Sequence, residues 1–350
     1  MTTAALLFCS LLPTAEAATL DVDAGVAFLK QAQNADGSWG SREVVGMTAM
    51  TTNALLRSGV PADDPTVADG LAFLRKNVRE DGGLYGEGTT HRNYDTALTL
   101  MTLKSAGLPE DEKLLAGAVG FLKGLQWDED EGVGPGDEAY GGAGYGSKSR
   151  PDLSNTQMFI EALKQAGMTE DDPALQKALT FVSRTQNLDG EHNRTKFAGL
   201  VKDGGFYYSP AAGGSSQAGE TENGGLRSYA SMTYAGLKSM VYAGLDKDDE
   251  RVQAATDWIR KNYSLRENPG LGQQGLFYYY LTFAKTMNAL GVDTFEDANG
   301  ESHDWRAELL SALAERQSED GSWSNKQDRW MEGDPVLVTA YALTAASFAN

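Results

Sequence analysis

A short pattern recurs along this chain and divides it into similar units. Residues 33–40 read Gln-Asn-Ala-Asp-Gly-Ser-Trp-Gly, and residues 317–323 read Gln-Ser-Glu-Asp-Gly-Ser-Trp. Weaker copies with fewer of these residues occur at 79–86, 126–127, 186–190 and 273–277. Self-similarity of this kind is typical of repeat architectures, in which each unit buries its apolar face against its neighbours.

The sequence around each copy predicts a pair of helices. Each copy follows a stretch with apolar residues at helical spacing, and it precedes a second stretch rich in Ala, Leu, Met and Thr. Acidic clusters then mark the next helix start, where carboxylates cap exposed amides and oppose the helix dipole. Five of the second stretches end on a glycine, the usual helix stop, at Gly59, Gly107, Gly167, Gly244 and Gly291. Six units of this kind predict twelve helices.

The two helices of a unit differ in polarity, which predicts how they are arranged. The first has a polar face, as at Lys30 and Gln31, whereas the second is apolar around most of its surface, as over residues 48–56. A helix that is apolar on all sides is buried. We therefore predict an all-α fold, an (α/α)6 toroid in which six outer helices surround six inner ones, as a single domain over residues 18–350.

Charge, cysteine content and the first residues bear on partners and location. The formal net charge of −19 argues against nucleic acid and against an anionic membrane surface as partners. Cys9 is the only cysteine, so the rest of the chain forms neither disulfides nor thiolate metal sites. The apolar run 4–12 followed by Ala-Glu-Ala at 15–17 predicts a signal peptide over residues 1–17, and thus a secreted or periplasmic protein. The missing basic start leaves a buried first helix or a misplaced start as alternatives.

The repeat resembles one found in a known superfamily. Gln-x-x-Asp-Gly-Ser-Trp after an apolar helix resembles the QW repeat of squalene and oxidosqualene cyclases and the related repeat of protein prenyltransferase beta subunits. The resemblance covers nearly all of residues 20–350 and implies the α/α toroid, but it does not specify an activity. It also implies that the repeat glutamines and tryptophans brace one repeat against the next, and these are Gln33, Trp39, Gln186, Gln317 and Trp323.

In such a ring the amino ends of the inner helices meet at one mouth, together with the longest loops, 127–153, 187–226 and 320–335. Loops on a rigid scaffold often carry function. An aromatic cavity there would suit an isoprenoid chain and stabilise a carbocation; alternatively, the aromatic side chains fill the centre of the ring. The candidate cavity residues are Tyr94, Tyr229, Tyr234, Tyr278, Tyr341 and Trp330.

Asp95 is the candidate catalytic residue. Tyr94-Asp95-Thr96-Ala97 resembles the end of the Asp-x-Asp-Asp-Thr-Ala motif, whose central aspartate is the proton donor of squalene cyclases. Arg92 and Asn93 stand where the preceding motif aspartates would be. The competing interpretation, which the residues favour, makes Asp95 a helix N-cap whose carboxylate accepts from the amides that follow it.

The sequence argues against two activities of the superfamily. The zinc site that the resemblance implies for prenyltransferases uses aspartate, cysteine and histidine, but there is no cysteine beyond Cys9. His91, His192 and His303 have no metal-pair spacing, so we expect no metal and no cofactor. The resemblance also implies two barrels for a complete squalene cyclase, and this chain has the length of one.

Three functional hypotheses remain open. The first is a cyclase-like toroid that binds or transforms an isoprenoid or other apolar ligand. The second is a non-catalytic scaffold that binds a partner protein through its mouth loops. The third is a polysaccharide lyase or hydrolase, which needs an acidic pair, supplied by Asp137 with Glu138, Glu220 with Glu222, or Glu332 with Asp334. Whether the chain is catalytic, which ligand it takes and its oligomeric state do not follow from the sequence.

Overall fold

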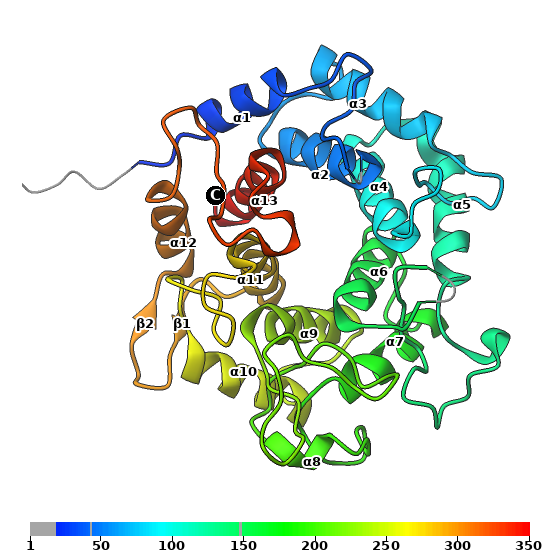
Figure 1. Cartoon of the computed structure of the whole chain (residues 1–350), viewed down its shortest axis with the longest axis vertical. Coiled ribbons are helices and arrows are strands. Elements are labelled where there is room, and N and C mark those ends of the chain that lie inside the picture. The colour runs from blue at the N-terminus through cyan, green and yellow to red at the C-terminus, as the bar shows by residue number, and fades with distance from the viewer. Residues whose placement is uncertain (1–18, 43, 147–148) are drawn as a thin grey trace, which may run out of the picture.

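The computed structural model describes residues 19–42, 44–146 and 149–350. The predicted leader, residues 1–17, lies outside them. Within the described residues, twelve helices of at least ten residues form two concentric rings (Figure 1). The inner ring consists of α2 (Val44–Arg57), α4 (Arg92–Ala106), α6 (Leu153–Gln165), α9 (Ala230–Tyr242), α11 (Leu276–Leu290) and α13 (Pro335–Ala349). The outer ring consists of α1 (Val22–Gln31), α3 (Pro65–Lys76), α5 (Glu112–Lys123), α7 (Pro173–Arg184), α10 (Glu250–Asn262) and α12 (Trp305–Ala314).

The inner ring is closed. Each inner helix packs against the next along the chain, and α13 packs against both α11 and α2. The prediction of an all-α (α/α)6 toroid is therefore confirmed. The remaining short elements lie in the connections: α8 (Ala198–Val201), the hairpin of β1 (Phe295–Glu296) and β2 (Ser302–His303), and the 3-10 turns η1 (Pro109–Asp111), η2 (Glu129–Glu131) and η3 (Arg329–Met331).

Aspartates start several outer helices and tie them to their neighbours. Asp64 caps α3 by accepting from the Thr66 N–H, and its other carboxylate oxygen lies 2.7 Å from the Lys30 ammonium on α1. Asp172 caps α7 in the same way and lies 2.6 Å from Lys123 on α5. Each carboxylate thus serves as a helix cap and as the partner of a cation near the end of the preceding outer helix.

The glutamine of the recurring loop joins one repeat to the next. The Gln33 side-chain amide donates to the Gly37 carbonyl at 3.0 Å and to the Thr66 carbonyl in α3 at 2.8 Å. Gln126 and Gln186 make the same two kinds of hydrogen bond to their own loops and to the next outer helix. One amide therefore fixes the loop and the following repeat together.

The loop tryptophans fasten the outer helix to the inner one. The indole N–H of Trp39 donates to the Leu29 carbonyl at the end of α1, and Trp323 does the same to Leu313 in α12. The backbone N–H of Trp39 donates to the hydroxyl of Thr48 in α2. Five inner helices carry such a threonine, 3.0–3.1 Å from the equivalent loop amide: Thr48, Thr96, Thr156, Thr233 and Thr339.

The seam between the last and first repeats closes the ring. Gln317, in the last loop, donates to the Asp21 carbonyl at 2.7 Å and accepts from the Asp21 N–H at 2.9 Å. In the inner ring, Arg57 of α2 donates to the Ser347 hydroxyl of α13 at 2.8 Å. The seam therefore repeats the glutamine contact found between consecutive units.

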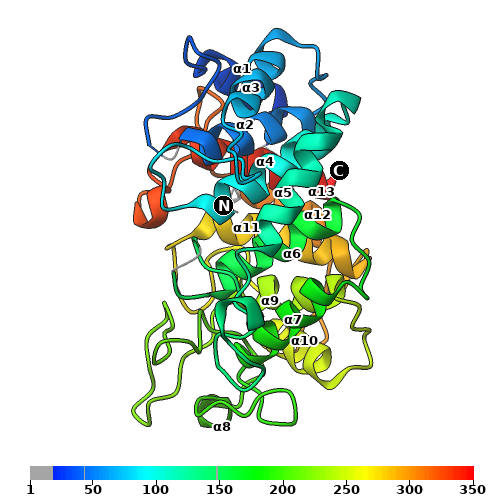
Figure 2. The same ribbon diagram turned by 90° about the vertical axis from the view of Figure 1, so that its right-hand side faces the viewer.

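All six inner helices begin on the same side of the ring. In the edge-on view of Figure 2, the long loops that precede them lie on the left, and the C-terminus lies on the opposite side. This arrangement gathers the helix amino ends and the long loops around one mouth, as the sequence predicts. None of the described helices combines the length and the apolar character needed to cross a bilayer.

Candidate functional site

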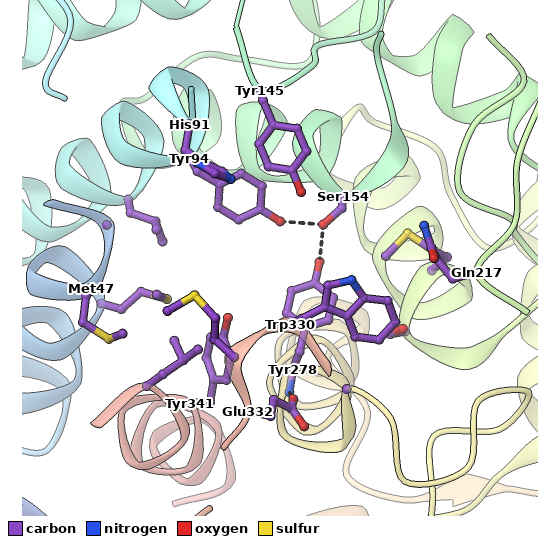
Figure 3. A pocket seen from close by; sticks show the side chains of 18 of the residues that line it. Met47, His91, Tyr94, Tyr145, Ser154, Gln217, Tyr278, Trp330, Glu332 and Tyr341 are labelled. Atoms are coloured by element: carbon purple, nitrogen blue, oxygen red, sulfur yellow. Dashed lines mark hydrogen bonds between the residues drawn. The ribbon is translucent and has the colours of Figure 1, made fainter. Parts of the chain in front are cut away.

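A cavity of about 240 Å³ opens at the mouth of the inner ring. It is bounded by the first turns of the inner helices and covered by the loops before α6, α9 and α13 (Figure 3). Its walls are mainly aromatic and methionine side chains. These include Tyr94, Tyr145, Tyr208, Tyr229, Tyr278, Tyr341, Trp330, Met47, Met50, Met232 and Met331. Such a lining binds apolar ligands and presents electron-rich ring faces to them.

Five of the six predicted cavity residues line this space: Tyr94, Tyr229, Tyr278, Tyr341 and Trp330. Tyr234 does not, which corrects the prediction. It is buried in the wall of the ring, where its side chain packs edge-on against Tyr279 of α11 and lies 5.2 Å from the ring centre of Phe283. The physical reason is helical spacing, because Tyr234 follows the cavity residue Met232 by two positions on α9, and residues two apart on a helix point about 160° apart.

A chain of hydroxyl groups crosses the cavity wall. Tyr94 on α4 lies 2.5 Å from the Ser154 hydroxyl on α6, which lies 3.0 Å from the Tyr278 hydroxyl on α11 (Figure 3). Gln157, one turn further along α6, donates to the same Tyr278 oxygen at 3.3 Å. Burial raises the pKa of Tyr278 to about 12, so it is a neutral hydroxyl at neutral pH. The wall is thus polar but uncharged here.

Trp330 forms the outer edge of the cavity. It is 46% exposed, and both Trp330 and Met331 have positive φ angles, 58° and 64°. Two consecutive non-glycine residues in the left-handed region store backbone strain. The neighbouring Arg329 donates to Gln217 of the loop before α9 and to Gln274 before α11. Contacts with two other loops therefore hold the strained turn over the mouth.

Asp95 lies in the cavity wall and is almost fully buried. Helix α4 begins at Arg92 after the N-cap residue His91, so Asp95 is a first-turn residue and the N-cap interpretation is wrong. Its carboxylate instead accepts from the Gly86 N–H of the preceding loop at 3.3 Å. The structure thus brings this acid to the same cavity as Tyr94 and Tyr341.

Glu332 is a second acid at the cavity, on the side of α13. Its carboxylate accepts from the Tyr278 N–H at 2.8 Å and from the Asn325 side chain at 2.7 Å. Burial raises its pKa above the ordinary glutamate value, against the effect of these hydrogen bonds. Asp334, its predicted partner, caps α13 by accepting from the Val336 N–H.

The other two predicted acidic pairs do not reach the cavity. Asp137 accepts from the Ala139 N–H, and its own carbonyl accepts from Arg184 on the outer ring. Glu220 and Glu222 are exposed in the loop before α9. Among the described residues that line the cavity, Asp95 and Glu332 are the two carboxylic acids.

One buried acid lies just behind the lining. Asp152 caps α6, where it accepts from the Asn155 N–H at 2.8 Å and from the Asn155 side chain at 2.9 Å. Burial raises its pKa to about 6, because the loss of water outweighs hydrogen bonds from Asn155 and Tyr208. Sequence reasoning missed this residue, although an aspartate before an inner helix is a detectable cap signal.

Away from the cavity, the β1–β2 hairpin brings Asp297, Glu301 and His303 together, with their ligand atoms within 4.8 Å of one another. His303 also lies 2.8 Å from Glu308 through its Nδ1 atom and stacks on Tyr263. None of these residues lines the mouth cavity described above. The sequence did not predict this cluster, since the three residues share no metal-site spacing.

Comparison with known proteins agrees with the fold. The model of the squalene-hopene cyclase C-terminal domain family matches residues 42–209. A squalene–hopene cyclase of Bradyrhizobium diazoefficiens is 27% identical over 194 residues, which is 48% of this chain and 29% of that protein. A second, from Zymomonas mobilis, is 26% identical over 46% of this chain and 24% of its own length. These matches thus span less than a third of either curated relative.

Solved structures share the double ring. A protein geranylgeranyltransferase-I of Candida albicans complexed with GGPP is 13% identical, with a TM-score of 0.60 over 94% of this chain and 90% of that one. A type II terpene cyclase from Scytonema is 14% identical, with a TM-score of 0.56 over 94% and 95%. A family 88 glycosyl hydrolase from Bacteroides vulgatus is 11% identical, with a TM-score of 0.55 over 94% and 97%.

At these identities the structures show the fold alone, and the fold is shared by proteins of different chemistry. The family-model match and the curated relatives, in contrast, show sequence similarity to squalene–hopene cyclases over about half of this chain. Together with the closed double ring, they show that this chain has the α/α toroid fold found in terpenoid cyclases and protein prenyltransferases, and that residues 42–209 are similar to the squalene-hopene cyclase C-terminal domain family.

Proposed function

We propose that this protein binds an isoprenoid or a similar apolar ligand in the mouth cavity. The observation that carries the proposal is the cavity itself, which is lined by tyrosine, tryptophan and methionine side chains from the inner helices and mouth loops. Methionine adapts to irregular chains, and aromatic rings supply large apolar faces. The proposal is supported by the similar double ring of a geranylgeranyltransferase solved with GGPP.

The size of the cavity favours a short ligand. Its volume of about 240 Å³ is below the roughly 300–1,000 Å³ typical of small-molecule sites. We therefore propose a chain shorter than the thirty-carbon squalene that gives the curated relatives their name. Chains of ten to twenty carbons, such as geranyl, farnesyl and geranylgeranyl derivatives, are the candidates to test.

The chemistry that this site supports best is cyclisation started by a proton. Asp95 lies in the wall, where its carboxylic acid would give a proton to a double bond of the bound chain. The electrons of that double bond form the new C–H bond, and the neighbouring carbon becomes a cation. The faces of Tyr94, Tyr341 and Trp330 line the same cavity and would stabilise that charge. The carboxylate left behind keeps its hydrogen bond from the Gly86 N–H.

Binding and turnover test this proposal separately. Geraniol, farnesol, geranylgeraniol and squalene are titrated while tryptophan fluorescence is recorded, and products are sought by gas chromatography with mass spectrometry. We expect saturable binding of at least one of the shorter alcohols and weaker binding of squalene. If no chain binds, the proposed function is wrong; binding without product indicates a non-catalytic binding protein.

Asp95→Asn tests the acid. The variant keeps the size of the side chain but has no proton to give, so it should bind the ligand with product formation reduced at least about a hundredfold. Asp334→Asn is the matched control, because it makes the same change at the start of α13 and asparagine still caps a helix. Unchanged turnover in Asp95→Asn would remove Asp95 from the mechanism.

A further inference from the structure

Three buried charged residues meet inside the inner ring, below the mouth cavity. Glu161 of α6 lies 2.5 Å from the ammonium group of Lys238 on α9 and 2.6 Å from that of Lys285 on α11. The three side chains are 2%, 1% and 9% exposed. Lys238 also donates to Gln157, which joins this cluster to the hydroxyl chain of the cavity wall.

The cluster carries an uncompensated positive charge. Burial raises the pKa of Glu161, but the two ammonium groups outweigh that effect and hold it at about 2, so the carboxylate is ionised. Burial lowers the pKa of Lys238 to about 8, which leaves it mostly protonated at pH 7. Two cations thus face one anion, and Arg57 lies close enough to interact with Glu161 as well. A surplus buried charge is costly unless a further partner of opposite sign is present.

Lys285 faces a second, smaller pocket. This pocket of about 30 Å³ lies further along the inner helices, and Lys285 is the charged residue among those that line it. It shares Met50, Tyr94 and Tyr341 with the mouth cavity, together with Leu98 and Tyr278. Lys285 follows Tyr278 by seven residues, which places it about 10 Å deeper along the helix. The two spaces are therefore consecutive along the axis of the ring.

The small pocket also contains an unpaired polar atom. The Oδ1 atom of Asn53, on α2, is buried and has no hydrogen-bond partner among the described residues. Buried polar atoms in proteins nearly always have partners, so such an atom calls for an explanation. An amide and an ammonium in one pocket are groups that bind an oxygen-bearing ligand group.

We propose that this deeper pocket is a subsite for the carboxylate end of an amphiphilic ligand whose apolar chain occupies the mouth cavity. A carboxylate oxygen accepts from Lys285, and its charge offsets the surplus of the cluster. A 180° rotation about the Cβ–Cγ bond of Asn53 exchanges its amide oxygen and nitrogen, so that the amide donates to the other carboxylate oxygen. The pocket volume of about 30 Å³ exceeds the roughly 10–15 Å³ that one water molecule needs, so the pocket suits a small end group such as a carboxylate and not a diphosphate.

The carboxylate subsite rests on the proposed function. Three probes of fifteen carbons test the subsite and the proposed function separately. Farnesoic acid, farnesol and farnesene differ in the end group and share the chain. We expect the wild-type protein to bind the acid at least about tenfold more tightly than the hydrocarbon at pH 7. Equal binding of all three contradicts the carboxylate subsite and leaves the proposed function standing. Failure of all three to bind contradicts both.

Two lysine variants locate the subsite. Lys285→Met removes the ammonium that lines the pocket, and Lys238→Met removes the same charge from the same Glu161 without lining it. Each variant leaves Glu161 paired with one lysine. We expect Lys285→Met to abolish the preference for the acid, and Lys238→Met to reduce it by no more than about threefold. Equal losses in both variants would overturn the proposal.

A third variant covers the case in which Lys285→Met does not fold. Asn53→Leu changes the pocket from a different helix, α2, and alters no charge. It should weaken binding of farnesoic acid about threefold or more while leaving farnesene binding unchanged or tighter. Thermal melting of each variant shows that the ring is intact. Unchanged affinity for the acid in a folded Asn53→Leu protein counts against the subsite.

Discussion

Asp152 shows how burial makes a single side chain sensitive to pH. Its pKa is about 6 in the folded protein, against an ordinary value of 3.8. Between these values the folded state binds more protons than the unfolded state, so the free energy of unfolding contributed by this group falls as pH rises from about 4 to about 6. Asp152→Asn cannot lose a proton, and asparagine keeps the capping role.

We therefore expect the free energy of unfolding of Asp152→Asn, relative to wild type, to increase by up to about 3 kcal/mol between pH 4 and pH 7. Urea titrations at both pH values measure it. Asp64→Asn is the control, because the Lys30 ammonium lowers the pKa of Asp64 below 3.8 and its stabilising effect is lost only below about pH 4, so this variant should change little between the two pH values. A difference that does not change with pH would show that burial does not perturb Asp152.

At the residue scale, the sequence predicted the aromatic side chains that line the cavity better than the charged side chains buried inside the ring. Five tyrosine and tryptophan positions followed from the mouth geometry, because a ring of parallel inner helices brings their first turns together. Lys238 and Lys285 were missed, although a lysine within an apolar inner helix is itself a signal. Glu161, Gln157 and Ser154 were missed too; their spacing of seven and three residues puts them on one face of α6.

At the scale of elements, glycines set how closely one repeat approaches the next. Gly141, in the loop before α6, has φ +82°, and a Cβ atom there would lie 1.8 Å from the Lys177 carbonyl oxygen of α7. Gly132, in the same loop, has φ +77° and nothing within 4 Å of its Cβ position. Alanine substitutions at these two glycines therefore separate two losses of stability: that from a left-handed backbone, and that from a close approach to the next helix.

Gly132→Ala should cost about 1 kcal/mol, because alanine pays only the left-handed conformation. Gly141→Ala should cost at least about 2 kcal/mol more, because the loop must also move away from the backbone of α7. Denaturant unfolding of the two variants gives the comparison. Similar losses in both would mean that the loop moves without resistance and that the contact does not fix the repeat spacing.

The elements were predicted with different success. The glutamine, glycine stops and acidic starts located all twelve long helices, since these signals act locally. The threonine that accepts from the loop amide in five repeats was not recognised, because threonine in an apolar helix reads as an ordinary core residue. The start of α4 was predicted wrongly, at Asp95, because aspartate is a common cap residue. His91 occupies the cap position without a capping side chain, and the Asp95 carboxylate accepts from a loop amide instead.

At the scale of the whole molecule, ring closure followed from an argument about buried faces and not from any single residue. Inner helices that are apolar on all sides need neighbours on both flanks, and only a closed array gives the first and last repeats the same surroundings as the rest. The depth of the hollow could not be obtained this way. It depends on which side chains project inward: Tyr94, Tyr278 and Tyr341 line both of its spaces, whereas Lys285 lines the deeper one.

The contact between Gln317 and Asp21 has a consequence for assembly. Every other junction in the circle is backed by the peptide chain, whereas this one relies on noncovalent bonds. A molecule that opens at this junction exposes the complementary surfaces of its first and last repeats. The last repeat of one opened molecule can then pack against the first repeat of another. Refolding from urea at high protein concentration should therefore yield exchanged dimers, while dilute refolding yields monomers. Size-exclusion chromatography across a concentration series would detect them, and Gln317→Ala should increase their share.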